Sequence, residues 1–224
     1  MQYRLQKEME KLKKNILTLG ALVEQRMQNA VTALNERDIG MAKKIVQGDY
    51  EIDHMEVELE EECLKLLALH QPVAIDLRFL IATLKINNDL ERIGDLVVNI
   101  CERVLFVATL PKPTIEFRFR EMSESVKKML KMSLDSLVTM DADLAREVCS
   151  MDEEVDAMNR DMYKAVEDTI DQRKNHMEVK QVLHLLSISR HLERIADLAT
   201  NIAEDVVYMI DGRIIRHMPE AYTD

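Results

Sequence analysis

One segment of the chain occurs twice, and this internal repeat is the feature that most limits how the chain can fold. Residues 90–102 read LERIGDLVVNICE and residues 192–204 read LERIADLATNIAE, which agree at nine of thirteen positions. Earlier positions match as well, because Asp49 and Asp53 correspond to Asp152 and Asp156 with an offset of 103 residues. Two copies of one sequence specify the same elements twice, so the repeat predicts two similar structural units.

The first copy has the pattern of three long helices. Apolar residues recur mostly every three or four positions across residues 5–37, which is typical of an amphipathic helix. Asp38 is suited to N-cap a second helix, predicted over residues 38–69, because its carboxylate can accept hydrogen bonds from first-turn N–H groups. Pro72 separates it from a third helix, predicted over residues 73–109.

Two prolines mark the boundary between the copies. Neither Pro111 nor Pro113 can donate a backbone hydrogen bond, and both restrict the preceding residue, so they end the third helix. We therefore predict domains at 1–110 and 114–212, followed by a polar tail at 213–224. The predicted fold is all-α, with two tandem, sequence-repeated three-helix antiparallel bundles and six long helices. The alternative is a single four-helix core with two extra helices, which the completeness of the repeat disfavours.

Composition argues against several other classes of protein. Five glycines and four prolines in 224 residues are too few for a β-rich fold, a Rossmann fingerprint or a P-loop. The 41 acidic and 30 basic residues give a net charge of −11, which disfavours nucleic acid as a partner. Cys63, Cys101 and Cys149 are odd in number and widely separated, which indicates reduced thiols. Without an apolar run of about 18 residues, we expect a cytoplasmic protein.

Acidic and amide side chains continue the apolar stripes of the predicted helices. On a helical wheel they fall on the same faces as the leucines and isoleucines that precede or follow them. Each copy of the repeat contributes two such stripes, one from its second helix and one from its third. In the first copy the stripes are Asp49, Asp53, Glu56 and Glu60, and Glu91, Asp95 and Asn99; in the second they are Asp152 and Asp156, and Glu193, Asp197 and Asn201.

Carboxylates on a packed face require compensation, because they lose hydration and repel one another. Lys or Arg partners, protonation or bound cations can supply it. Oxygen donors without His or Cys suit hard or intermediate ions such as Mg²⁺, Mn²⁺ or iron, so the stripes predict one metal site per copy. The other interpretation is a solvated acidic face that pairs with Arg92 and Arg194.

Catalytic chemistry has little support in the sequence. Glu51 and His54 have the Glu-x-x-His spacing of di-iron carboxylate proteins, but such sites need two of these motifs, and Ala157 replaces the histidine in the second copy. No nucleophile and base can be paired, so we expect no catalytic residues. A di-metal carboxylate enzyme or a metal-storage bundle is the alternative to a binding protein.

The motifs resemble those of a known family. Asp76-Leu-Arg78-Phe-Leu-Ile-Ala, Asn88-Asp-Leu-Glu91-Arg-Ile-Gly-Asp95 and Glu193-Arg-Ile-Ala-Asp197 are similar to motifs of the PhoU family of phosphate-uptake regulators. The resemblance covers nearly the whole chain. It implies a cytoplasmic, non-enzymatic negative regulator of phosphate-starvation signalling that bridges the ATPase subunit of a phosphate ABC transporter and a membrane sensor histidine kinase. We also expect a homodimer with only peripheral proximity to the membrane.

The resemblance also implies where metal ions bind. Several family members carry metals on these motifs, and the ion here is expected to be iron, Mn, Mg or Zn. Carried over by position, the ligands are Glu91 and Asp95 with Asp49 and Asp53, and Glu193 and Asp197 with Asp152 and Asp156; Asn99, Asn201, Glu56 and Glu60 are possible additional ligands. Arg190, Asn159 and Tyr163 replace Asn88, Glu56 and Glu60 in the second copy, so we expect its site to bind fewer ions or to bind them more weakly.

Overall fold

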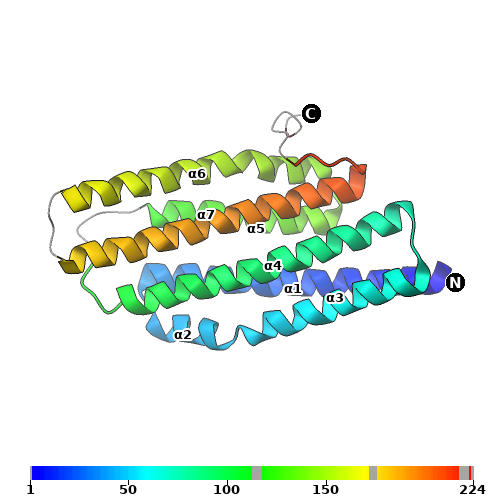
Figure 1. Ribbon diagram of the computed structural model, residues 1–224, viewed down its shortest axis with the longest axis horizontal. Helices are drawn as coiled ribbons and strands as arrows, with labels where there is room; N and C mark the ends of the chain where they lie inside the picture. The colour runs from blue at the N-terminus through cyan, green and yellow to red at the C-terminus, as the bar shows by residue number, and fades with distance from the viewer. Residues whose placement is uncertain (1, 113–117, 172–175, 217–221, 223–224) are drawn as a thin grey trace.

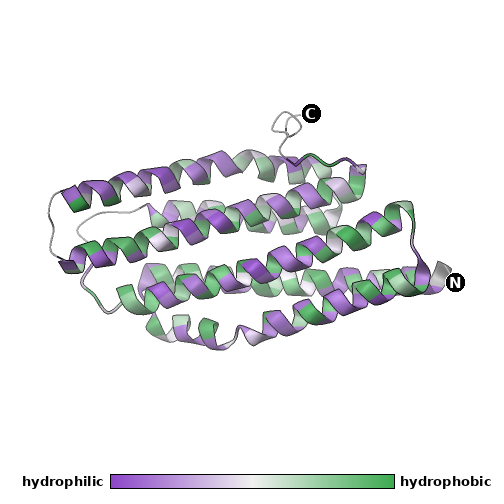
Figure 2. Cartoon of the chain, in the orientation of Figure 1, coloured by the Kyte–Doolittle hydropathy of each residue, from purple (hydrophilic) through white to green (hydrophobic). Residues whose placement is uncertain are grey.

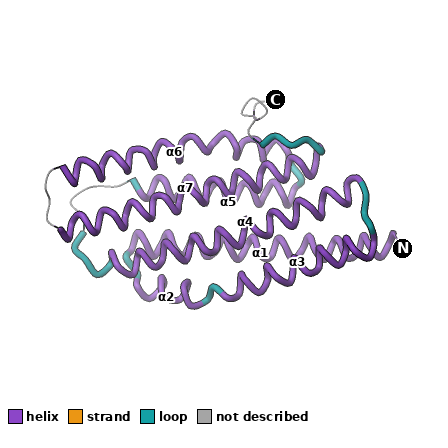
Figure 3. The backbone as a smooth tube through the Cα atoms, in the orientation of Figure 1, coloured by secondary structure: helices purple, strands orange, loops and turns teal. Residues whose placement is uncertain are grey.

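The computed structural model describes residues 2–112, 118–171, 176–216 and 222, and within them it contains helices and connections but no strand (Figures 1 and 3). The predicted all-α fold with six long helices is confirmed, and one short helix is added. The first copy of the repeat forms α1 (Gln2–Glu36), α2 (Ile39–Gln47), α3 (Tyr50–His70) and α4 (Ala74–Val107). The second forms α5 (Phe119–Thr139), α6 (Ala142–Asp171) and α7 (His176–Asp211).

The second helix of the first copy is interrupted, and on this point the sequence prediction is wrong. One helix was predicted over residues 38–69, whereas Gly48 and Asp49 separate α2 from α3. Asp38 caps α2 as predicted, since its carboxylate accepts a hydrogen bond from a first-turn N–H at 3.0 Å. The carbonyl oxygen of Gly48 accepts a hydrogen bond from the guanidinium of Arg26 in α1. A side chain outside the segment therefore supports the break.

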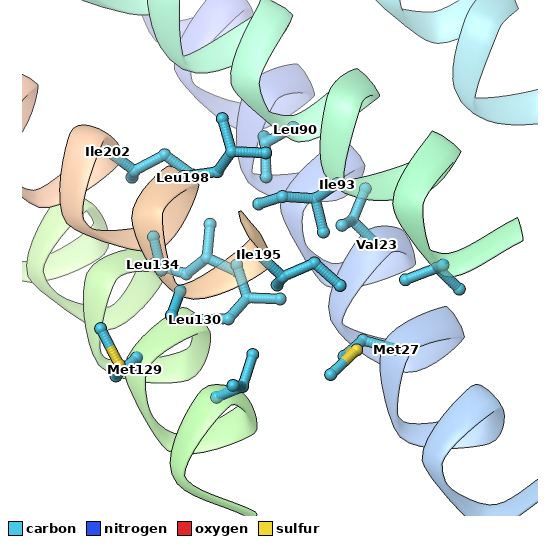
Figure 4. Close-up of a cluster of buried hydrophobic side chains, with 14 of the residues drawn as sticks. Val23, Met27, Leu90, Ile93, Met129, Leu130, Leu134, Ile195, Leu198 and Ile202 are labelled. Carbon is cyan, nitrogen blue, oxygen red and sulfur yellow. The ribbon is translucent and has the colours of Figure 1, made fainter. Parts of the chain in front are cut away.

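The two copies share one core. Helix α4 packs along α7, α1 contacts α4 and α5, and α5 contacts α7, while α3 and α6 flank the outside. Side chains from all four central helices meet in Figure 4, among them Val23 of α1, Ile93 of α4, Leu130 of α5 and Ile195 of α7. The structure thus combines the two repeated three-helix units with the four-helix core that was the alternative.

Each helix buries one apolar stripe and exposes a polar one (Figure 2). Cys63, Cys101 and Cys149 are free and buried, as predicted, and burial raises the pKa of each thiol to about 12. These thiols stay protonated and unreactive at neutral pH. None of the described helices has an apolar stretch long enough to cross a membrane.

Charged side chains enter the core where α4, α7 and the segment after α7 meet. The ammonium of Lys85 donates to a carboxylate oxygen of Asp205 at 2.7 Å, and the guanidinium of Arg216 lies 3.5 Å from the same oxygen. Asp89 lies one turn along α4 and is only 8% exposed. Burial, followed by the charge of Asp205, raises the pKa of Asp89 to about 6 although three cations partly oppose the shift. A carboxylate is thus buried at the packing surface at a cost in stability.

We expect Asp89→Asn to reduce the pH dependence of stability. The pKa of Asp89 is about 6 in the folded protein and 3.8 without the fold, so the folded state binds more protons between about pH 4 and pH 6. Stability is therefore lost as the pH rises through that window, by on the order of 2 kcal/mol. Urea unfolding at about pH 5 and pH 7.5 should show a smaller difference for D89N than for the wild type.

Asp168→Asn is the matched control, because Asp168 is an exposed carboxylate on α6. This variant should keep the wild-type pH dependence. If D89N also keeps it, the buried charge of Asp89 does not limit stability.

Candidate metal sites

Five carboxylates from two helices gather in the first copy. We call Asp49, which immediately precedes α3, Asp53 and Glu56 of α3, and Glu91 and Asp95 of α4 the first acidic cluster. The pKa of Glu91 is raised by burial first, then by the charges of Asp95, Glu56, Asp53 and Asp49. The pKa of Asp49 is raised by burial and by Asp53 and Asp95. The structure therefore brings the predicted ligands of the first site together, close enough to repel one another.

A glycine allows the two helices of this cluster to approach. A Cβ on Gly94 would lie 2.9 Å from Cδ1 of Ile52, closer than side chains normally pack. Gly94 lies between Glu91 and Asp95 in the sequence, so the close approach falls at the cluster itself. In the second copy Ala196 replaces Gly94, and a valine replaces Ile52. The added methyl group on one helix is thus matched by a smaller side chain on the other.

Arg26 supplies a fixed positive charge beside the first acidic cluster. One guanidinium nitrogen donates to the carboxylate of Glu51 at 2.8 Å and to the carbonyl oxygen of Gly48. The other lies 3.9 Å from a carboxylate oxygen of Asp49 and is buried without a hydrogen-bond partner. Arg26 lowers the pKa of Asp49, but burial and the acidic neighbours outweigh it. Sequence analysis missed Arg26; its replacement by Met129 in the repeat alignment was the available signal.

The second acidic cluster comprises Asp152 and Asp156 of α6 and Glu193 and Asp197 of α7. Burial comes first among the causes that raise the pKa of Glu193 and Asp197, followed by neighbouring carboxylates. The pKa of Asp152 is raised to about 6 by burial, then by Asp197 and Asp156. These predicted ligands are therefore brought together as well, on a helix that has no break.

One carboxylate oxygen of Asp152 is buried and accepts no hydrogen bond of normal geometry. The hydroxyl of Thr200, which neighbours this Oδ1 atom, is close enough to lower the pKa of Asp152 but does not reach hydrogen-bond geometry, so neither oxygen has a fully formed hydrogen bond. A cavity of about 650 Å³ adjoins them and is also lined by Asp197, Asn201 and Glu204. A buried carboxylate oxygen without a donor is costly unless a proton or a cation satisfies it. That the second site binds fewer ions or binds them more weakly stays a prediction. The unpartnered oxygen of Asp152 instead favours a cation bound at this site.

The possible additional ligands have different positions. Glu60 is exposed, and its charge reaches the first cluster through Glu56, whose pKa it helps to raise. The amide nitrogen of Asn99 donates to the backbone oxygen of Asp95 at 2.9 Å, one turn beyond the cluster. Asn201 lies in the cavity beside Asp152.

The donor chemistry fits a hard cation, although the side chains do not form a closed cage. In the described part of the chain, no three His, Cys, Asp or Glu side chains converge to hold a metal ion as they stand. The donors gathered at both clusters are carboxylate oxygens, with amide and hydroxyl oxygens beside them, which suit Mg²⁺, Mn²⁺ or iron. The orphaned Oδ1 of Asp152 is the observation that fits a bound cation most directly.

The fold and the paired clusters define a class of protein: an all-helical tandem repeat with one acidic face per copy. The family model described as PhoU domain matches residues 16–104 and 119–206, so the chain belongs to the PhoU family. It is 36% identical over 216 residues to a phosphate-specific transport system accessory protein PhoU homolog of Aquifex aeolicus, covering 96% of each chain. It is 31% identical to the accessory protein PhoU of Escherichia coli, covering 94% of this chain and 87% of that one.

Solved structures agree with this assignment. The crystal structure of PhoU from Pseudomonas aeruginosa matches with a TM-score of 0.89 at 33% identity, covering 93% of this chain and 99% of that one. The phosphate transport system regulatory protein PhoU from Streptococcus pneumoniae matches with a TM-score of 0.85 at 29% identity, covering 94% and 98%. Family membership therefore extends over both repeats and their relative arrangement.

We expect Arg26→Met to destabilise the protein by about 1–3 kcal/mol, because it removes charge-assisted hydrogen bonds from the break between α2 and α3. Methionine is the residue of the second copy, so the change tests the role of the charge with a side chain that the repeat tolerates. Urea unfolding measures the effect. Arg160→Met, at an exposed position, should change stability by less than about 0.5 kcal/mol. Equal effects of the two changes would contradict the role of Arg26.

Proposed function

We propose that this protein is the cytoplasmic accessory regulator of a phosphate-specific transport system. In this role it restrains phosphate-starvation signalling and modulates phosphate uptake. The observation that carries the proposal is the match of both repeats to the PhoU domain, together with relatives that are named accessory proteins of such a system over nearly their whole length. Tandem helical units with extended acidic faces suit binding to other proteins.

We further propose that the protein bridges two partners. The ATPase subunit of the phosphate ABC transporter and a membrane sensor histidine kinase are the partners that the family resemblance implies. Two related units offer two similar surfaces on one rigid body, because α4 and α7 lock the copies together through a shared core. Such a body can hold two proteins at a fixed separation. A homodimer would double the number of surfaces.

Metal ions are proposed to occupy both acidic clusters. Glu91, Asp95, Asp49 and Asp53 would hold ions in the first cluster, and the equivalent residues of α6 and α7 in the second. A bound cation supplies positive charge that offsets the mutual repulsion of the carboxylates. The carboxylates orient the ions, and the polar side chains around them shape the surface that a partner meets. Iron, Mn, Mg and Zn are the candidate ions.

The enzyme alternative gains no support from the side chains that suggested it. The imidazole of His54 is 74% exposed and pairs with Glu58 at 3.2 Å, outside the first acidic cluster. Glu51 pairs with Arg26 instead. The Glu-x-x-His spacing thus forms no part of the acidic cluster, and we propose a regulatory protein without catalytic activity.

Removing the acidic pairs should remove metal. Glu91→Ala with Asp95→Ala should abolish the metal of the first site, and adding Glu193→Ala and Asp197→Ala should abolish that of the second. Elemental analysis of protein purified without an affinity tag gives the stoichiometry, and circular dichroism checks the fold. Glu167→Ala with Asp171→Ala removes two exposed acids at the same spacing on α6 and should leave the metal content unchanged. Full metal content in the quadruple variant would refute the assignment.

Chelation should weaken partner binding. We expect pull-down of the ATPase subunit or the sensor kinase by the purified protein to fall when metal is removed, and to recover when Mg²⁺ or Mn²⁺ is returned. Unchanged binding without metal would make the acidic clusters solvated faces of a structural adaptor. Binding of neither partner under any condition would contradict the bridging role itself.

A further inference from the structure

A polar trough lies between the two acidic clusters, where α4 and α7 pack side by side (Figure 1). We call this cavity of about 360 Å³ the central trough. Every residue that lines it has its repeat equivalent on the opposite wall, at an offset of 102. Each helix thus contributes the same four side chains, including one leucine. The polar pairs are Arg92 and Arg194, Asp95 and Asp197, and Asn99 and Asn201.

The two arginines of the central trough make no short hydrogen bond to a carboxylate of the described residues. Arg194 is exposed and has no ion pair within 4 Å among them, although its charge lowers the pKa of Glu193 and Asp197. Arg92 is 57% exposed, and its ion pair with Asp89 is long, at 3.8 Å. By contrast, Arg26 and Arg146 each make shorter hydrogen bonds to carboxylates. Two guanidinium groups with free donors therefore face one cavity.

We propose that the central trough binds a phosphate-class oxyanion, with the guanidinium groups of Arg92 and Arg194 as its principal donors. Guanidinium groups present parallel N–H donors that match tetrahedral oxyanions, and such charge-assisted hydrogen bonds are among the strong ones. The amides of Asn99 and Asn201 add neutral donors on the same walls. The trough is larger than a phosphate ion requires, which leaves room for water or for an ester substituent.

Asp95 and Asp197 make the proposed site dependent on cations. Both carboxylates face the trough and also belong to the acidic clusters, so they oppose an anion as long as they are charged. Cations on the clusters would offset that charge, and this coupling rests on the proposed function. By linkage, the anion would then strengthen cation binding by the same factor. Anion binding in the trough would thereby be coupled to cation binding at both acidic clusters.

Isothermal titration of the full chain with inorganic phosphate tests the proposal, once after chelation and once with Mg²⁺. We expect saturable binding of about one phosphate per chain that is tighter with Mg²⁺. Arg92→Gln with Arg194→Gln should weaken it by about tenfold or more for each arginine. Arg4→Gln with Arg118→Gln removes two arginines that are 76% and 61% exposed, and this variant should bind phosphate as the wild type does.

The outcomes separate this proposal from the proposed function. Absence of phosphate binding in both conditions, or unchanged binding by the R92Q/R194Q variant with a normal melting temperature, overturns the oxyanion site. Mg²⁺ binding measured separately, without phosphate binding, overturns it while leaving the metal sites standing. Arginine-dependent phosphate binding without any cation binding supports the site and overturns the metal coupling. Glycerol phosphate as a second probe identifies the source: tighter binding indicates a phosphoryl group on a larger molecule, and weaker binding indicates free phosphate.

Discussion

The antiparallel packing of α4 against α7 is the contact on which the rest of the structure depends. These helices occupy the same position in the two repeats and run in opposite directions (Figure 1), so near the middle of their contact equivalent side chains such as Arg92 and Arg194 line the two walls of one trough. Leucine and isoleucine side chains fill the inner side of that seam (Figure 4). On the outer side, the acidic clusters and the central trough fall into register. Without this contact the two copies would be separate bundles with unrelated polar faces.

Bringing carboxylates together lowers the stability of the fold, and the two copies of the repeat offset this repulsion in different ways. In the first, Arg26 brings a buried positive charge to Asp49 and supports the break between α2 and α3. In the second, Met129 takes the place of Arg26, and Asp152 keeps an orphaned buried oxygen and a pKa of about 6. Duplicated sequences have thus reached different solutions to the same repulsion. In the first copy the compensating guanidinium is buried, whereas in the second the cations near the cluster, Arg160 and Arg194, are exposed.

Much of the fold follows from local signals in the sequence. Pro72 and Pro111 set helix ends because the backbone of proline cannot continue a helix, and the N-cap at Asp38 depends on its own side chain. Periodicity also placed Glu91 and Asp95 on the correct face. Periodicity identifies a buried face but does not identify what covers it, so the core shared between the copies could not be derived. The break at Gly48 was likewise hidden, since the arginine that supports it lies in another helix.

The candidate sites show the same division between local and long-range information. Helical spacing predicts that two carboxylates one turn apart share a face, but whether they remain solvated depends on a second helix. Gly94 decides this in the first copy, because its missing side chain admits Ile52 and draws α3 against α4. In the second copy Ala196 and Val155 stand at these positions, and both are fully buried, so the methyl group added on α7 is accompanied by a smaller side chain on α6. Carboxylates gather on the facing helices of both copies although these packing residues differ, so the gathering does not depend on one particular side chain.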